Sequence, residues 1–271
     1  MESSAVARQL DRVQLAAVAL GMFALALALR SLLFRLDAFR AFYEAHPSQI
    51  GEAVWKTGWV IVACSGVMLA HGVGARAALR ELGLGGAETG RGLLYAFAAT
   101  LPALIAFALA FPVTHTSDPW QLGMTALISP LSEEVLFRGY IFRQLYARAG
   151  WPFWAALLVN VIPFAWGHLG QADRAGGGLL TVVGVLAVTG LGAGLFAWLF
   201  VRSGYSLWFV IGLHALLNLY WYVFTVSNTA IGGWLSNLAR MATLGLAIWL
   251  SSVLAHRRSA QGTILSDAPA A

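Results

Sequence analysis

Long apolar runs separated by short polar segments extend along almost the whole chain. Eight such runs can be distinguished, at residues 13–34, 54–75, 92–113, 120–150, 152–168, 179–201, 207–226 and 231–255. A helix needs roughly 20 mostly apolar residues to cross the hydrocarbon core of a bilayer, and most of these runs have about that length. The pattern therefore predicts an all-α membrane protein, a multi-pass bundle of about eight transmembrane helices.

The composition agrees with a membrane protein and excludes several other classes. Of the 271 residues, 59% are hydrophobic and 11% are charged, and the mean hydropathy of +0.73 is too high for a soluble domain. The single cysteine, Cys64, excludes an intrachain disulfide and a cysteine-based metal motif. No internal repeat or second domain is evident, so residues 1–271 are predicted to form one membrane domain.

Basic residues are distributed unevenly between the two sides of the predicted spans. With the N-terminus inside, ten of them fall in cytoplasmic segments and five outside, namely Arg30, Arg35, Arg40, Lys56 and Arg174. Since basic residues collect on the cytoplasmic side, we expect both termini to be cytoplasmic and the 114–119 loop to lie outside. The net charge of +5 is then explained by topology, without nucleic acid as a partner. Abundant Arg, Ala and Gly are typical of a high-GC bacterial genome, so the expected location is a bacterial inner membrane.

Three charged side chains, Glu133, Glu134 and Arg138, lie in the middle of the run at 120–150. An ionisable group in the hydrocarbon core is costly unless it is paired or hydrated, so such a cluster indicates a functional site. Ser129 and Pro130 are a typical N-cap and first helical residue, and they predict that a helix restarts or kinks there. Glu134 and Arg138 are four residues apart and can form an ion pair, whereas Glu133 has no such partner on its own helix.

Two later spans also contain polar groups at helical spacing. His168 lies one turn after Phe164 and two turns after Asn160, and His214 lies one turn before Asn218. Taken alone, a histidine or asparagine in an apolar helix is more often a hydrogen-bonded packing residue than a catalyst. The charged cluster and these two groups, however, occur on three separate spans and all need burial partners. One shared, water-filled chamber would satisfy all of them.

These positions match three short motifs of a known family. The motifs are Glu-Glu-x-x-x-Arg at 133–138, Phe-x-x-x-His at 164–168 and His-x-x-x-Asn at 214–218. In this order on three helices they resemble the motifs of the CPBP family, the type II CAAX prenyl endopeptidases and their bacterial relatives, also called Abi proteins. The resemblance covers about residues 120–226, with no substitution at a motif position. It implies an intramembrane endopeptidase acting on a membrane-associated substrate, such as a prenylated CAAX-type protein.

The resemblance also implies roles for the matching side chains. In this family the first glutamate and the histidine of the second motif activate water, which carries that role over to Glu133 and His168. The histidine and asparagine of the third motif form an oxyanion hole, which carries that role over to His214 and Asn218. A donor of this kind typically contributes about 3 kcal/mol to stabilising the tetrahedral intermediate.

Other interpretations of the same residues remain open. Glu134 and Arg138 are expected either to support the site or orient the substrate, or to be a buried ion pair without catalytic duty. Two histidines and two glutamates could instead bind zinc in an intramembrane metalloprotease, but no His-Glu-x-x-His sequence is present, so no cofactor is expected. A third class is non-catalytic: a transporter, or a protein that binds a membrane partner, as in bacteriocin immunity.

Overall fold

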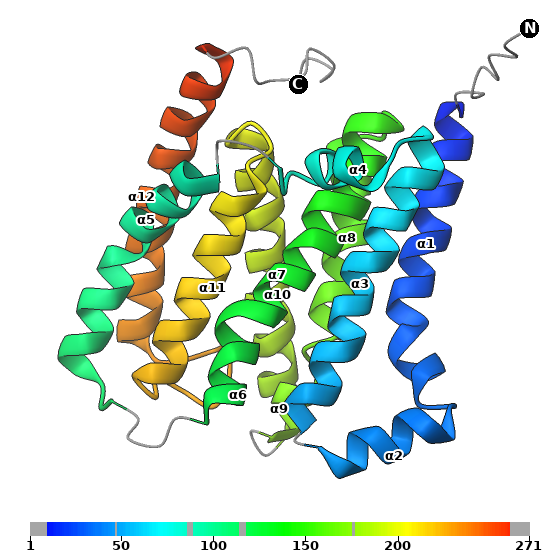
Figure 1. Ribbon diagram of the computed structural model, residues 1–271. Coiled ribbons are helices and arrows are strands. Elements are labelled where there is room, and N and C mark those ends of the chain that lie inside the picture. Colours follow the sequence, from blue (N-terminus) through cyan, green and yellow to red (C-terminus); the bar gives the residue numbers. More distant parts are fainter. Residues whose placement is uncertain (1–9, 47, 86–88, 114–117, 175–176, 261–271) are drawn as a thin grey trace, which may run out of the picture.

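The computed structural model describes residues 10–46, 48–85, 89–113, 118–174 and 177–260, and within these ranges the chain forms helices and connecting turns only. The predicted all-α fold is thus confirmed (Figure 1). The elements are α1 (Arg12–Leu33), α2 (Asp37–Ala45), α3 (Ser48–His71), α4 (Ala75–Glu81), α5 (Thr89–Ala110), α6 (Pro119–Gly123), η1 (Met124–Ile128), α7 (Ser129–Glu134), η2 (Val135–Phe142), η3 (Gln144–Arg148), α8 (Phe153–Trp166), α9 (Gly170–Arg174), α10 (Leu179–Arg202), α11 (Leu207–Val223) and α12 (Trp234–Ala260).

Most of the predicted spans correspond to a long apolar helix. In the described part of the chain, six helices are long and apolar enough to cross a membrane: α1, α3, α5, α8 with its continuation through α9, α10 and α12. Helix α11 is equally apolar but has only 17 residues. The predicted span at 120–150 is helical, but α-helical and π-helical segments alternate along it, and it carries the charged residues. A multi-pass membrane protein is therefore supported, whereas the count of eight spans stays a prediction.

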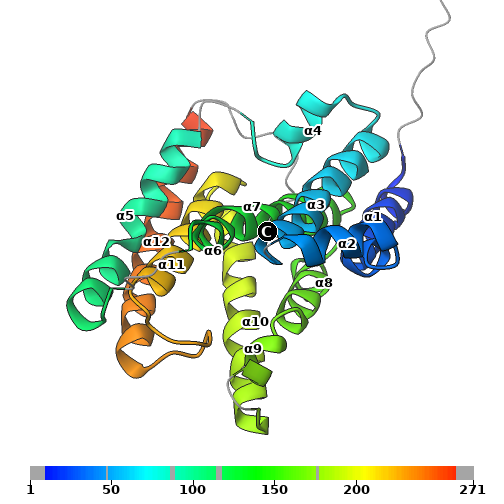
Figure 2. The same cartoon turned by 60° about the horizontal axis from the view of Figure 1, so that its bottom comes forward.

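The elements α6, η1, α7, η2 and η3 follow one another without a break, and we call this run the central helix. Helices α1, α3, α8, α10 and α11 contact it, α5 packs against α11, and α12 packs against α5 and α10 (Figures 1 and 2). Every side chain of η2 is buried. A helix that is apolar on all sides needs such an enclosure, and this position places the charges of the central helix inside the bundle.

The sequence predicted that a helix restarts or kinks at Ser129 and Pro130, and the restart is wrong because the helix continues through both residues. Ser129 has helical backbone angles (φ −63°, ψ −53°), and its N–H donates to the carbonyl oxygen of Met124, five residues earlier. Pro130 lacks an N–H and its ring crowds the preceding turn, and the wide π-helical turn of η1 just before it accommodates the ring. The Ser132 hydroxyl then donates to the carbonyl oxygen of Ile128 (2.6 Å). The glutamates therefore lie inside a continuous helix and not in its first turn.

The second span begins earlier than predicted, at Ser48 instead of residue 54. Part of the segment expected to be a polar loop forms α2, in which Phe39 is buried while Asp37 and Glu44 are exposed. Such an amphipathic helix suits the surface of a bilayer, and α2 lies across the lower end of the bundle (Figure 1). As a consequence, Lys56 lies two turns inside α3 and not at the outer end of the span, where it was counted.

The first turn of α1 and the last turns of α12 lie at the same end of the bundle, the upper end in Figure 1. This is the arrangement expected when both termini are on one side of the membrane. The side that is cytoplasmic stays a prediction, and most of the loop predicted to lie outside, residues 114–117, is outside the described residues.

An ion-pair cluster fixes the upper end of the central helix. Arg148 donates to both carboxylate oxygens of Glu81 at the end of α4 (2.7 and 2.6 Å), and Arg143 lies 3.5 Å from the same carboxylate. Burial alone would raise the pKa of Glu81, but the Arg148 hydrogen bond and the two guanidinium charges lower the pKa below its usual value. The arginine-bearing end of the central helix is thus tied to the face that carries the first turn of α1 and the last turns of α12.

Candidate active site

The buried ion pair predicted from the four-residue spacing is present. Arg138 Nη1 donates to Glu134 Oε1 (3.1 Å), and the two side chains are 1% and 0% exposed. Arg138 Nη2 also donates to the carbonyl oxygen of Ala193 on α10 (3.3 Å), and its guanidinium lies 4.7 Å from the centre of the Phe164 ring. The pair therefore links the central helix to α8 and α10.

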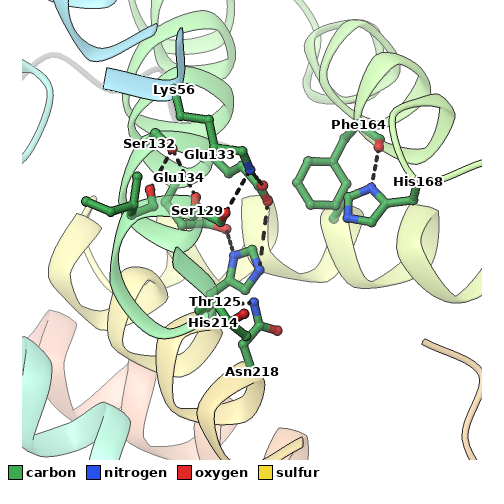
Figure 3. A network of polar contacts seen from close by, with 12 residues as sticks. Lys56, Thr125, Ser129, Ser132, Glu133, Glu134, Phe164, His168, His214 and Asn218 are labelled. Carbon is green, nitrogen blue, oxygen red and sulfur yellow. Dashed lines mark hydrogen bonds and ion pairs between the residues drawn. The ribbon is translucent and has the colours of Figure 1, made fainter. Parts of the chain in front are cut away.

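His214 of α11 lies between the two glutamates (Figure 3). Its Nδ1 is 2.8 Å from Glu134 Oε1, and its Nε2 is 3.9 Å from Glu133 Oε2. A carboxylate oxygen accepts hydrogen bonds, so Nδ1 is the donating nitrogen. Glu134 thereby fixes the orientation of the imidazole and leaves Nε2 to face Glu133 and the space beside it.

Glu133 has a cationic partner that the sequence analysis missed. Lys56 Nζ of α3 donates to Glu133 Oε1 (2.6 Å) and to the Ser129 hydroxyl (2.9 Å), and Lys56 is 8% exposed. The absence of a partner for Glu133 thus holds only along its own helix. The ammonium stabilises the negative charge of the carboxylate and holds Oε1, while Oε2 stays on the side of His214. One feature of the sequence could have indicated a buried role for this side chain: Lys56 is the only lysine of the chain and lies in a segment rich in aromatic and apolar residues.

His168 follows the end of α8 and faces Glu133 from the opposite side (Figure 3). Its Nδ1 lies 2.8 Å from the carbonyl oxygen of Phe164, and a carbonyl can only accept, so Nδ1 carries the hydrogen. In the neutral imidazole the lone pair is then on Nε2. Such a tautomer can accept a proton from a group bound between His168 and Glu133.

The two asparagines of the predicted polar groups have different surroundings. Asn218 of α11 makes only a long hydrogen bond, from Nδ2 to the carbonyl oxygen of Thr125 (3.4 Å). Asn160 of α8 is completely buried and donates to the carbonyl oxygen of Phe137 (2.9 Å). Asn160 is therefore a packing residue between α8 and the central helix, whereas Asn218 can turn to a bound ligand.

A single cavity brings the predicted site residues together. It has a volume of about 510 Å³ and lies between α10 on one side and α11 and α12 on the other. All six predicted residues line it: Glu133, Glu134, Arg138, His168, His214 and Asn218. The shared polar chamber expected from the sequence is thus present, and its volume is in the range that binds a small ligand or a short peptide segment.

The cavity reaches the lipid-facing surface of the bundle. Leu191 of α10 and Met241 of α12 line it, yet they are 77% and 65% exposed. Both belong to helices long and apolar enough to cross the membrane. The cavity therefore has a lateral opening at the boundary between α10 and α12.

The residues of the cavity do not form an obvious metal site. Among the described residues, no three His, Cys, Asp or Glu side chains are grouped so that they could hold a metal ion. One oxygen of each glutamate, Oε1, is engaged by Lys56 or Arg138, and His168 lies across the cavity from Glu133. This donor set does not suit the three protein ligands of catalytic zinc, and independence from metal stays a prediction.

Comparison with known protein families agrees with the motif resemblance. Residues 115–220 match the model of the family described as Rce1-like, type II CAAX prenyl endopeptidase. The matched segment contains all three motifs, so the predicted resemblance is confirmed, and the family is one of proteases. No curated protein and no solved structure matches the chain.

Proposed function

We propose that this protein is an intramembrane endopeptidase that hydrolyses a peptide bond of a membrane-embedded substrate, without a metal, using Glu133 and His168 to activate water. The observation that carries the proposal is the placement of both side chains on opposite sides of one cavity, with His214 and Asn218 beside them (Figure 3). The match of residues 115–220 to a CAAX endopeptidase family supports the same reaction class.

Water activation uses the atoms that the hydrogen bonds leave available. Glu133 Oε2 faces the cavity while Oε1 is held by Lys56, and His168 Nε2 has its lone pair because Nδ1 is bound to Phe164. A water bound between these two atoms gives a proton to one of them as its oxygen attacks the carbonyl carbon of the peptide. When the C–N bond of the tetrahedral intermediate breaks, the same proton passes to the leaving amine.

In this mechanism the oxyanion of that intermediate lies beside α11. Asn218 Nδ2 is a donor whose present hydrogen bond is weak, and His214 Nε2 donates there when it carries a hydrogen. Each donor directed at the developing charge contributes about 3–4 kcal/mol to the barrier reduction. Because His214 Nδ1 is held by Glu134, the imidazole is oriented before substrate binds.

Lys56, Glu134 and Arg138 are assigned supporting roles in this mechanism. Lys56 holds the carboxylate of Glu133, and Arg138 compensates the charge of Glu134, which in turn orients His214. None of the three needs to touch the reacting atoms. This interpretation joins the two alternatives left by the sequence, because the buried ion pair is also the support of the site.

The direction of substrate access follows from the lateral opening between α10 and α12. A substrate anchored in the bilayer by a lipid or an apolar helix enters there without leaving the membrane, which fits a membrane-bound peptide as partner. The cavity residues Gln171 and Asn237 belong to α9 and to the first turns of α12, which lie at the lower end of the bundle, opposite the first turn of α1 (Figure 1). With both termini cytoplasmic, as the arginine bias predicts, this end faces away from the cytoplasm.

The test is cleavage of a fluorescent, membrane-anchored peptide by purified protein in lipid vesicles, with Glu133→Gln as the decisive variant. Glutamine keeps the shape of the side chain but cannot take a proton, so cleavage is expected to vanish while thermal stability stays near that of wild type. Cleavage by Glu133→Gln at the wild-type rate would show that another residue is the base. Absence of cleavage by the wild type with all anchored peptides would favour the non-catalytic, partner-binding alternative.

A further inference from the structure

The connection between α11 and α12 crosses the lower end of the cavity. We call its residues, 224–233, the strap; it is orange in Figure 2, where it extends towards α10. Ala230 of the strap lines the cavity, as does Gln171 of α9. The side chain of Ile231 lies so close to α10 that a Cβ added to Gly184 would be 2.9 Å from its Cδ1. The strap therefore joins the α11 and α12 side of the cavity to the α9 and α10 side.

Contacts with α11 and α12 fix the strap on its own side of the cavity. The carbonyl oxygen of Ala230 accepts a hydrogen bond from Arg240 Nη1 (2.7 Å), and the Arg240 guanidinium lies 3.7 Å from the centre of the Trp221 ring. Trp221 Nε1 donates to the carbonyl oxygen of Ser227 (3.0 Å). Thr225, near the start of the strap, has a φ of 46°, which a β-branched residue rarely adopts. Surrounding contacts must maintain such a backbone, so the strap follows a defined path.

One side-chain hydrogen bond connects the strap to the helical turn that carries His168. The N–H of Ala230 donates to Gln171 Oε1 (3.1 Å), and the N–H of Gln171 donates to the carbonyl oxygen of His168 (2.9 Å). Gln171 Nε2 makes no hydrogen bond within the described part of the chain, so the acceptor oxygen is the atom in use. Gln171 thus links the strap to the backbone of the proposed catalytic histidine.

The distance between His168 and Glu133 depends on contacts between the two sides of the cavity. The hydrogen bond from His168 Nδ1 to the carbonyl oxygen of Phe164 (2.8 Å) lies within one segment and fixes the ring only relative to the end of α8. Among the residues that the structure describes, the ring makes no hydrogen bond to the central helix or to α11. The two residues just before His168 are exposed. The bond between Gln171 and the strap supplies a constraint across the cavity.

We infer that Gln171 is a positioning residue, whose hydrogen bond to the strap holds His168 in place across the cavity from Glu133. The inference rests on the proposed function, because it names a support of the water-activating pair. Gln171 acts through His168 and is assigned no contact with the reacting atoms. A catalytic group is effective only while its surroundings keep it near the productive position, and a displacement of about 1 Å can lower the rate by roughly 10²-fold.

The experiment compares replacements that keep or remove the acceptor oxygen of Gln171. Gln171→Glu keeps an acceptor for the N–H of Ala230 but removes the amide donors, and Arg240, bound to the same residue, compensates the added charge. Gln171→Met has a similar length without the acceptor, and Gln171→Ala is a second such variant in case the methionine is not accommodated. Gln14→Met is the matched control, because Gln14 Oε1 also accepts one backbone N–H, that of Asp11 (3.1 Å), at the start of α1.

The first measurement is kcat and KM for the membrane-anchored peptide. We expect Gln171→Met and Gln171→Ala to lower kcat by roughly 10- to 100-fold and to leave KM within about twofold. Gln171→Glu and Gln14→Met should keep the wild-type kcat. A wild-type kcat in Gln171→Met would overturn the inference. An equal loss in Gln171→Glu together with a higher KM would also overturn it, because the amide would then bind the substrate.

Amide hydrogen exchange followed by mass spectrometry tests the contact without cleavage. In Gln171→Met, exchange in segments 225–233 and 166–172 should be faster by roughly 2- to 10-fold, the effect of one hydrogen bond, and in Gln171→Glu it should be unchanged. If the wild type cleaves no peptide, the endopeptidase proposal is refuted, and exchange alone decides on Gln171. Faster exchange in both segments supports the coupling of the strap to the His168 turn, and unchanged exchange in 166–172 contradicts it.

Discussion

Replacing Glu134 by glutamine tests whether the buried ion pair holds the site together. The substitution keeps the size of the side chain and one hydrogen-bond acceptor but removes the charge opposite Arg138. Since Arg138 is 1% exposed, its guanidinium cannot turn to water and is left with uncharged acceptors, among them the carbonyl of Ala193. The result is an uncompensated charge in the centre of the bundle.

The magnitude follows from the geometry. Two unit charges 3.1 Å apart attract by about 5 kcal/mol at an effective dielectric constant of 20. Breaking a buried pair by removing one partner typically costs about 3–5 kcal/mol. For a chain of this size, such a loss lowers the unfolding temperature by on the order of 10 °C. Glu134→Gln should therefore also reduce the yield of folded protein.

The assay is thermal unfolding in detergent, with Glu44→Gln on the exposed side of α2 as the matched control. The double variant Glu134→Gln, Arg138→Met removes both charges and should be more stable than Glu134→Gln alone. A Glu134→Gln protein that unfolds at the wild-type temperature would refute the reasoning, because it would mean that the guanidinium is stabilised without the carboxylate.

Four further outcomes can be measured with the same material. Lys56→Met should abolish cleavage and destabilise the protein because it strands the Glu133 carboxylate, whereas Lys56→Arg should restore both; a fully active Lys56→Met would contradict the supporting role. His168→Ala should abolish turnover. Asn218→Ala should keep a low residual activity, because the loss of one oxyanion donor lowers kcat by roughly 10²- to 10³-fold; equal losses of activity in the two variants would argue against this division of roles. Strong chelators should leave the rate unchanged, and stoichiometric zinc whose removal stops cleavage would establish the metalloprotease alternative. Reporter fusions after Arg80 and at the C-terminus should give cytoplasmic signals, and a periplasmic signal from either one would reverse the predicted orientation.

The fold class and the site cluster could be predicted from the sequence because both depend on local spacing. Apolar runs of about 20 residues indicate spans, and residues four apart on a helix share a face. The ion pair of Glu134 with Arg138 and the common cavity were accessible in this way. So was the resemblance to the family, because three motifs in a fixed order are a specific signal.

The contacts between distant elements could not be predicted in the same way. Lys56 pairs with Glu133 across 77 positions, and nothing in the local pattern of α3 indicates the partner. Lys56 was counted on the outside because it lies only two residues into the predicted span, which starts at residue 54, whereas α3 starts at Ser48. Likewise, Ser129 and Pro130 favour a helix start, and the enclosing helices override this preference because they bury the central helix on all sides.

In the proposed mechanism the opening between α10 and α12 faces acyl chains and not water, which changes the quantity that sets the reaction rate. A substrate confined to the bilayer reaches Leu191 and Met241 by diffusion within a plane, so its relevant abundance is the number of molecules per lipid. Adding inert lipid at fixed amounts of enzyme and substrate therefore slows cleavage, although no concentration in the buffer changes. A peptide of ideal sequence that stays in the aqueous phase remains uncut, because partitioning into the membrane precedes recognition.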